Sequence, residues 1–348
     1  MTRKARIGVI GAGWWAALNH LPALKALPDC DVVAVNRLGA AELAEVQRAF
    51  GVPLGFEDYR VMLESVPLDG VVIASPHGLH YEHAVAALAK GCHVLVEKPL
   101  TTRAADARAL VAKAEAVGKQ VIVPYGWNFK PWTDRAHALV ASGALGRIEH
   151  VIVQMASALE DLFAGRAMKE TEGHMFRPPA STWADPAHAG GYGWGQLTHA
   201  LGLLFRIADL APAEVFALTG KSPANVDYYD AGVVRFANGA TAVLSGSSTV
   251  PKHRGFQIDI RIFGSEGMLL LDIERERLEV RRRDGRDTIV DMPPGSGAYA
   301  CEKPLKTLVD FCLGAPAENQ SPGVVGMRAV EVLDALYRSA ASGNLERV

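Results

Sequence analysis

The residue types and spacing best suited to chemistry occur in this 348-residue chain at Glu97-Lys98-Pro99. An ammonium group can hydrogen-bond an alcohol, stabilise the alkoxide charge that develops on it and help to move its proton. Lys98 is therefore our first catalytic candidate. The plainer alternative is a lysine that caps a strand.

A glycine-rich turn, Gly11-Ala-Gly13-Trp14-Trp15-Ala16, lies between a short apolar run and a helical pattern. The first glycine permits a tight turn, the second lets the backbone approach a pyrophosphate, and the small alanine lets the helix pack closely on the strand. The N-terminus of the helix offers free N–H groups to phosphates. The turn, including both tryptophans, therefore predicts a dinucleotide site; a purely structural turn is the alternative.

The second apolar run ends in Asn36-Arg37, where a domain that binds NAD places an acidic residue. Without a carboxylate nothing repels a 2′-phosphate, and Arg37 is able to pair with one. We therefore favour NADP over NAD as the cofactor. The alternative is NAD, with Arg37 at the surface and Asn36 hydrogen-bonded to a ribose.

These candidate residues must be positioned by the elements around them. The first 124 residues alternate short apolar runs with longer helical patterns, which is typical of β-α units in a parallel, doubly wound sheet. The predicted strands are 5–10, 31–35, 70–74, 93–96 and 120–123, and the predicted helices are 14–27, 40–50, 79–90 and 102–117. We therefore expect an NAD(P)-binding Rossmann domain at 1–124.

From about residue 148 the predicted strands are longer and are joined by tight turns. Asn238-Gly239 and Asp284-Gly285 suit the positive φ angles of two-residue hairpins. The predicted strands are 148–155, 214–219, 232–236, 241–244, 257–263, 268–273, 278–280 and 288–290, and a helix is predicted at 327–342. The fold class is therefore α/β: an N-terminal Rossmann domain with a C-terminal α+β domain, 125–348, built on a large, mostly antiparallel open sheet.

Three segments together resemble the Gfo/Idh/MocA oxidoreductases, a family of sugar and inositol dehydrogenases. They are the glycine turn, Ser75-Pro-His77-Gly-Leu-His80 and Glu97-Lys98-Pro99, of which the last is the most specific. The resemblance covers nearly the whole chain. It implies that Lys98 is catalytic, that Glu97 lies near the nicotinamide, and that Ser75 and His80 line the cofactor cleft.

Residues 190–199 resemble the family's glycine-rich start of a helix that carries an aspartate and, one turn later, a histidine. His199 matches the histidine, which makes it our second catalytic candidate, because an imidazole titrates near neutral pH and suits a general base. The plainer alternative is a histidine that is hydrogen-bonded within its own domain. Gly195 stands where the aspartate is expected. Gln196 falls on the same helical face as His199 and could hydrogen-bond the imidazole or the substrate. How Lys98 and His199 divide the proton transfer is therefore open.

The substrate site is less well defined by the sequence. Trp127 and Asn128 follow the last Rossmann strand, where the family places residues that face the substrate. Aromatic rings and amide groups suit a sugar, which has apolar C–H faces and many hydroxyls. The segment 158–189, which includes His174, has little periodicity; we expect either a loop over the cleft or a mobile surface loop.

Composition excludes several classes of protein. The net charge is -2, so nucleic acid and anionic membranes are poor partners. The four cysteines lack metal-ligand spacing, and His77, His80 and His83 have no carboxylate partner at diagnostic spacing, so we expect no metal site. We find no targeting segment or membrane span, which favours a cytoplasmic protein. Because one face of the predicted sheet needs covering, we expect a homodimer or homotetramer.

The sequence thus predicts an NAD(P)-dependent dehydrogenase that acts on a CH–OH group of a sugar, sugar lactone or polyol. That the substrate is an aldose oxidised at its anomeric carbon is implied only by the resemblance to the family. Two other functions stay open at this point. One is a glycosidase of the same fold that uses tightly held NAD, and the other is a non-catalytic NAD(P) or sugar sensor.

Overall fold

The computed structural model describes residues 3–348, which form two compact units. The first unit contains the chain up to residue 126 together with 168–179 and 300–327. The second contains 127–167, 180–299 and 328–348. The chain therefore passes between the units repeatedly. The domain boundary that the sequence places after residue 124 lies close to the first of these crossings.

The first unit is built on a six-stranded, wholly parallel sheet with the strand order β3-β2-β1-β4-β5-β6. Its strands are β1 (Ala5–Ile10), β2 (Cys30–Asn36), β3 (Leu54–Phe56), β4 (Gly70–Ile73), β5 (His93–Val96) and β6 (Val121–Ile122). The Rossmann domain expected from the sequence is confirmed. β3 was not predicted, because three residues are too few to give a periodic signal.

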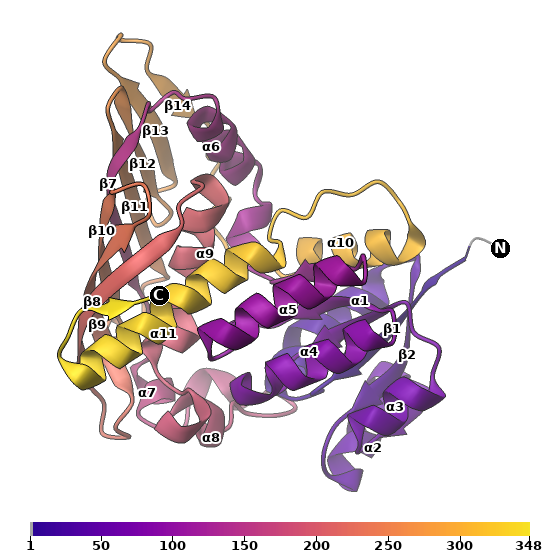
Figure 1. Ribbon diagram of the computed structural model, residues 1–348. Helices are drawn as coiled ribbons and strands as arrows, with labels where there is room; N and C mark the ends of the chain where they lie inside the picture. Colours follow the sequence, from indigo (N-terminus) through magenta and orange to yellow (C-terminus); the bar gives the residue numbers. More distant parts are fainter. Residues whose placement is uncertain (1–2) are drawn as a thin grey trace. The chain divides into compact units, whose positions relative to one another are not determined.

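Helices cover both faces of this sheet. On one face α4 (His80–Ala89) packs against α3 (Tyr59–Ser65) and α5 (Ala104–Ala116), and Figure 1 shows α4 and α5 side by side. On the other face α1 (Leu21–Ala26) packs against α2 (Ala40–Phe50) and α10 (Glu302–Leu313). The helix predicted at 14–27 is present, but a π-helical turn, η1 (Ala16–His20), precedes α1.

The second unit is built on a nine-stranded sheet with the order β14-β13-β12-β11-β7-β10-β9-β8-β15. Only β7 and β10 pair in parallel. The strands are β7 (Ile148–Ala156), β8 (Pro212–Lys221), β9 (Asp227–Phe236), β10 (Thr241–Ser247), β11 (Gln257–Gly264), β12 (Gly267–Asp272), β13 (Arg277–Arg282), β14 (Thr288–Val290) and β15 (Glu346–Arg347). The mostly antiparallel sheet is confirmed. Gly239 and Gly285 have φ angles of 86° and 74° in the two predicted hairpins.

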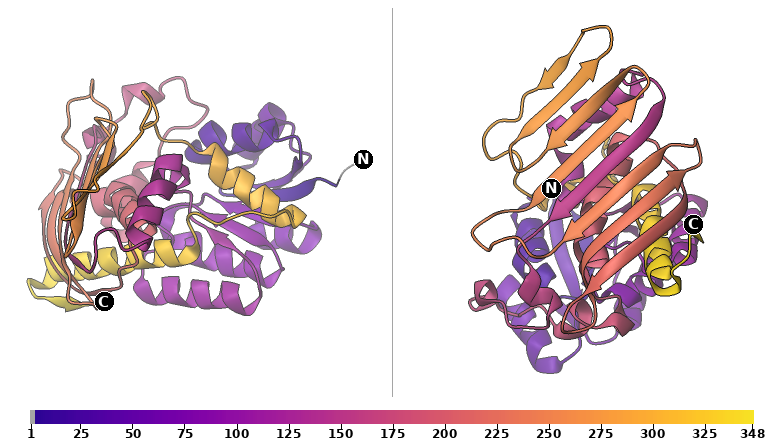
Figure 2. Two further views of the ribbon diagram at one scale, coloured as in Figure 1. Left: turned by 90° about the horizontal axis from the view of Figure 1, so that it is seen from above. Right: turned by 90° about the vertical axis from the view of Figure 1, so that its left-hand side faces the viewer.

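Only one face of this large sheet is covered by helices. Alternate residues of β9 and β10 are buried, and the right-hand view of Figure 2 looks onto the open face. The covered face carries α9 (Thr198–Ile207), which follows a second π-helical turn, η6 (Gly193–Leu197). The remaining helices are α6 (Pro131–Ala141), α7 (Glu160–Phe163), α8 (Ala180–Trp183) and α11 (Gly323–Ser342), which runs from the first unit into the second. No helix within residues 3–348 has the length and apolar character to cross a membrane.

Candidate functional site

The glycine turn closes against the end of β4. Gly11 has a φ of +80°, and a Cβ atom on it would lie 2.5 Å from the backbone N and Cα of Ser75. The amides of Gly11 and Ala12 both donate to the carbonyl of Asn36, at 3.1 and 2.9 Å. Only glycine fits this position, because both the φ angle and the contact exclude a side chain. The turn therefore lies at the carboxyl ends of three neighbouring parallel strands, the usual ligand-binding edge of such sheets.

The helix after the turn begins with two tryptophans. The indole N–H of Trp14 donates to Nδ1 of His174 over 3.0 Å, and the two rings are stacked. The indole Nε1 of Trp15 is buried and makes no hydrogen bond within the described residues. His174 belongs to the segment 168–179, which is part of the first unit. This segment thus packs on the glycine turn, which a mobile surface loop would not do.

Arg37 also contacts both the turn and this segment. Its guanidinium donates to the carbonyl of Ala12 over 3.3 Å and lies 3.8 Å from the ring centroid of Phe176. Its Nε atom is buried and has no hydrogen-bond partner in the described part of the chain. Asn36 uses its amide nitrogen to donate to the carbonyls of Phe56 and Glu57. Because both N–H groups of this amide are engaged, Asn36 can only accept a hydrogen bond from a ribose.

His80 is fully buried and connects two loops. Its Nδ1 lies 2.7 Å from the carbonyl of Pro99, and its Nε2 lies 2.8 Å from the carbonyl of Ser75. Burial lowers the pKa of His80, while the two carbonyls and Glu97 oppose that shift. The hydroxyl of Ser75 lies 2.9 Å from Nδ1 of His83. His80 therefore fixes the loops that carry Ser75 and Lys98, and its ring nitrogens are occupied within the protein.

Glu97 and Lys98 follow β5 directly and are both buried. Nε2 of His20, in η1, donates to Oε1 of Glu97 over 2.8 Å, and the backbone amide of Lys98 donates to Oε2 over 3.1 Å. Burial alone would raise the pKa of Glu97, but the hydrogen bond and charge of His20, with Lys98, lower it overall. Glu97 is therefore a buried carboxylate held from two sides. His20 was not among our predicted site residues, because one histidine in an apolar helix gives no spacing signal.

The side chain of Lys98 is the most strongly perturbed cation of this group. Burial lowers its pKa from 10.5 to about 8, and the negative charge of Glu97 opposes the shift. An amine with a pKa near the working pH is suited to accepting and returning a proton. The peptide bond between Lys98 and Pro99 is cis.

In the second unit, His199 lies on α9 between aromatic rings. The ring of Trp127 meets the imidazole edge-on with centroids 5.7 Å apart, and the ring of Tyr299 does so at 5.2 Å. Trp127 is itself buried, packs against Tyr299 and donates its indole N–H to the carbonyl of Gly297 over 2.8 Å. Trp127 therefore supports His199 and Tyr299 and does not offer an open platform. Tyr299, which is partly exposed, was not predicted.

Gly195 and Gln196 lie in η6, which directly precedes α9. Gln196 is buried, and its Oε1 accepts no hydrogen bond from any described residue. A Cβ atom on Gly195 would lie 2.9 Å from two ring carbons of Phe163 and 3.2 Å from Trp183. The aspartate that the family resemblance implies would not fit there, because these rings fill its space. A π-helical turn also adds a residue to the helix and so changes which side chains share a face with His199.

The structure does not support the predicted role of Asn128 at the substrate. Its side chain is fully buried, and its amide nitrogen donates to the carbonyl of Gly202 on α9 over 3.1 Å. It follows that Asn128 joins the loop containing Trp127 to the helix containing His199.

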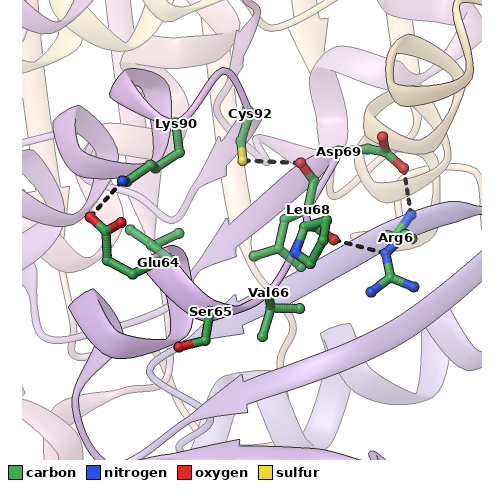
Figure 3. Close-up of a pocket in the computed structure, with 10 residues that line it drawn as sticks. Arg6, Glu64, Ser65, Val66, Leu68, Asp69, Lys90 and Cys92 are labelled. Carbon is green, nitrogen blue, oxygen red and sulfur yellow. Dashed lines mark hydrogen bonds and ion pairs between the residues drawn. The ribbon is translucent and has the colours of Figure 1, made fainter.

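A separate pocket, shown in Figure 3, lies at the amino ends of the parallel strands, opposite the ends that carry the glycine turn. Its polar groups pair with each other: Lys90 with Glu64, and Arg6 with the carbonyl of Pro67 and the carboxylate of Asp69. These residues precede β4 and β5 or begin β1, whereas Gly11, Ser75 and Lys98 follow the strands. This pocket is therefore not part of the candidate site.

The first unit fits a dinucleotide on its own geometry. Gly11 lets the backbone turn tightly beside Ser75, and the buried Nε1 of Trp15 and Nε of Arg37 are donors without a hydrogen-bond partner among the described residues. Among residues 3–348 no group of three or more histidine, cysteine or acidic side chains is arranged to hold a metal ion.

Comparison with protein-family models gives two matches. The model described as "Oxidoreductase family, NAD-binding Rossmann fold" matches residues 5–125, and the model described as "GFO/IDH/MocA C-terminal domain" matches residues 133–270. Together they cover most of the chain, including both the glycine turn and the helix of His199.

Named relatives match over nearly the full length. The chain is 28% identical to D-xylose 1-dehydrogenase (NADP(+)) 2 of Haloferax volcanii over 345 residues, covering 97% of each protein. It is 25% identical to D-apiose dehydrogenase of Paraburkholderia graminis, covering 98% of this chain and 89% of that one. Among solved structures, levoglucosan dehydrogenase in complex with NADH and levoglucosan superposes with a TM-score of 0.77 at 21% identity, over 99% of this chain and 100% of the other. This last likeness concerns the fold.

Proposed function

Because this chain belongs to the Gfo/Idh/MocA oxidoreductase family, we propose that it is an NAD(P)-dependent dehydrogenase that oxidises a CH–OH group of a sugar, sugar lactone or polyol. The observation that carries the proposal is that Lys98 is a buried amine with a pKa of about 8. It lies at the carboxyl ends of the parallel strands, as the glycine turn does. The relatives named above are dehydrogenases of sugars. They give no support to the glycosidase or the sensor.

In this proposal the residues of the chain handle the proton. A nicotinamide cofactor bound at the glycine turn would supply the acceptor for the hydride of the substrate carbon. The neutral amine of Lys98 takes the hydroxyl proton as the carbonyl forms, and the ammonium form returns it in the reverse direction. His199 and Gln196 are proposed to bind substrate hydroxyls. Glu97, which His20 holds, accepts the backbone amide of Lys98 and so fixes the backbone from which the amine extends.

The test is an absorbance screen for reduced nicotinamide with a panel of aldoses, lactones and polyols, using NAD and NADP in parallel. Lys98→Met is expected to abolish turnover while keeping cofactor binding. His199→Ala is expected to lower kcat. Near-normal turnover of His199→Ala at every pH would make this histidine architectural, and silence of the wild-type protein with every substrate would overturn the dehydrogenase.

The choice of NADP over NAD rests on Arg37. Its guanidinium lies beside the glycine turn, β2 ends in Asn36 and not in a carboxylate, and its Nε makes no hydrogen bond to any described residue. We expect Arg37→Asp to raise the KM for NADP at least about tenfold, as the loss of a charge-assisted pair implies. The KM for NAD is expected to change little. An unchanged KM for NADP would refute pairing of Arg37 with the 2′-phosphate.

The open face of the nine-stranded sheet supports a homodimer or homotetramer. Four apolar side chains on adjacent strands are between 42% and 64% exposed there: Leu218, Tyr229, Val233 and Val243. Such a contiguous patch is unusual on a monomer. Light scattering should give the mass of a monomer for Val233→Lys/Val243→Lys and a larger mass for the wild-type protein; a monomeric wild-type protein would contradict the proposal.

The cysteines are all free, which suits the cytoplasmic location that we also propose.

A further inference from the structure

Two aspartates of β9, Asp227 and Asp230, are buried together on the covered face of the large sheet, where they are 2% and 3% exposed. A carboxylate buried to this degree needs hydrogen-bond donors, and without them burial favours the neutral acid. Two buried carboxylates side by side would also repel each other strongly.

The other contacts of the two groups show where the proton resides. Asp227 accepts from the backbone amide of Gly193 over 2.7 Å and from the hydroxyl of Tyr337 over 2.9 Å. Asp230 receives no N–H or O–H hydrogen bond from any described residue. The donors therefore stabilise the charge on Asp227, whereas Asp230, buried without a donor, is left as the neutral acid.

Asp227 in turn holds the start of the helix that carries His199. Gly193 is the first residue of η6, and the hydroxyl of Tyr337 accepts the next amide, that of Trp194, over 3.2 Å. Gly191, with a φ of +121°, passes so close that a Cβ atom on it would lie 1.9 Å from Oδ1 of Asp227. The glycine-rich segment before η6 is thus shaped around this carboxylate.

We propose that Asp227 and Asp230 share one proton and form a positioning pair, in which the protonated Asp230 keeps Asp227 charged and Asp227 fixes η6 and, through it, Gln196 and His199. Loss of the shared proton at alkaline pH would place two charges in this buried site and loosen the turn. Burial raises the pKa of both aspartates, and for Asp230 the charge of Asp227 raises it further.

The titratable groups that face the pair come from four elements or their flanks. They are Lys221 at the end of β8, Tyr192 just before η6, Tyr337 on α11 and the two aspartates themselves. Burial raises the pKa of both Tyr192 and Tyr337 well above the ordinary value of a tyrosine. Lys221 is exposed, and its ammonium lies near the carbonyl of Asn225. The proton of the pair is therefore the one expected to leave first as the pH rises.

The test compares three variants of the full chain. Asp230→Asn replaces the carboxyl group by an amide, which has N–H groups but cannot titrate. Asp227→Asn places an amide N–H group opposite two other donors, the backbone amide of Gly193 and the hydroxyl of Tyr337. Asp259→Asn, on β11, removes a surface carboxylate paired with Arg261 and serves as the control. Infrared spectra at neutral pH should show the C=O band of a protonated carboxyl group in the wild-type protein and in Asp259→Asn, but not in Asp230→Asn. This readout does not depend on the proposed dehydrogenase activity.

Stability and kinetics complete the test. Between pH 7 and pH 10 the melting temperature of the wild-type protein should fall more than that of Asp230→Asn. The size of this fall should be the same in sodium, potassium and choline salts. Asp227→Asn should lower kcat by about tenfold or more, because misplacing a reacting group by a fraction of an ångström has effects of that size. An absent carboxyl band, or a pH dependence that follows the cation present, would overturn the shared proton. Normal kcat in Asp227→Asn would overturn the positioning role.

Discussion

Replacing Lys98 by methionine should make the protein more stable while abolishing its proposed activity. The folded protein binds the Lys98 proton less tightly than the unfolded chain does, because burial lowers the pKa from 10.5 to about 8. The difference corresponds to about 3 kcal/mol that opposes folding whenever the amine is charged in both states. Methionine has a similar length and no charge, so it removes this cost.

The pH dependence of the effect follows from the direction of the shift. Below about pH 8 the amine is charged in both states, and the stability difference between Lys98→Met and the wild-type protein is at its full value. Between about pH 8 and 10.5 the folded protein loses the proton first, so the difference shrinks toward zero. Other titrating groups, including Asp230, are common to both proteins and cancel in the comparison.

The measurement is denaturant unfolding of both proteins at pH 7, 8, 9 and 10. Lys25→Met is the matched control, since Lys25 is exposed in the last turn of α1, and it should change stability by less than about 0.5 kcal/mol at every pH. A Lys98→Met protein that is less stable than the wild type at pH 7, or a difference that stays constant up to pH 10, would refute the claim that Lys98 is a buried, destabilising cation.

Three further expectations concern neighbouring residues. In the oxidation direction, kcat/KM should rise with pH and level off above about 8, because only the neutral amine of Lys98 accepts the proton; a profile with no inflection between pH 7 and 9 would contradict this. His20→Ala should cost about 3–5 kcal/mol in denaturant unfolding, since it leaves the carboxylate of Glu97 buried without its histidine, whereas Glu97→Gln should cost clearly less. Gly195→Ala should cost about 1–3 kcal/mol because its Cβ meets the ring of Phe163, while Gly78→Ala, in open space, should be nearly neutral; equal melting temperatures would show that the ring moves aside at no cost.

Most of the Rossmann unit could be predicted because its strands are buried on both faces and appear as short apolar runs. β1 and β5 have the predicted bounds, and β2 and β4 differ by one residue at their ends. The helix α10 was missed, although it packs on α1 and on the parallel sheet. It comes from residues 302–313, far along the chain, and nothing in a local pattern says which sheet a distant helix covers.

The candidate site could be predicted only where a short motif, defined by its residue types and spacing, is typical of one function. The glycine turn and Glu97-Lys98 meet that condition. The contacts of His174 with Trp14 and of Phe176 with Arg37 do not, because they join residues more than a hundred positions apart through a segment without periodicity. The burial of Asn128 likewise depends on α9, which its own neighbours in the sequence do not reveal.

The glycine at position 195 is explained by packing and not by flexibility. Phe163 and Trp183 occupy the space that a side chain on Gly195 would need, and the π-helical turn shifts Gln196, a neutral amide, into the neighbouring position. An amide can bind a substrate hydroxyl but cannot take up a proton at neutral pH. Lys98 has a pKa of about 8 and lies beside the buried negative charge of Glu97. We therefore infer that in this chain the proton moves through Lys98, and that the helix of His199 contributes hydrogen bonds to the substrate.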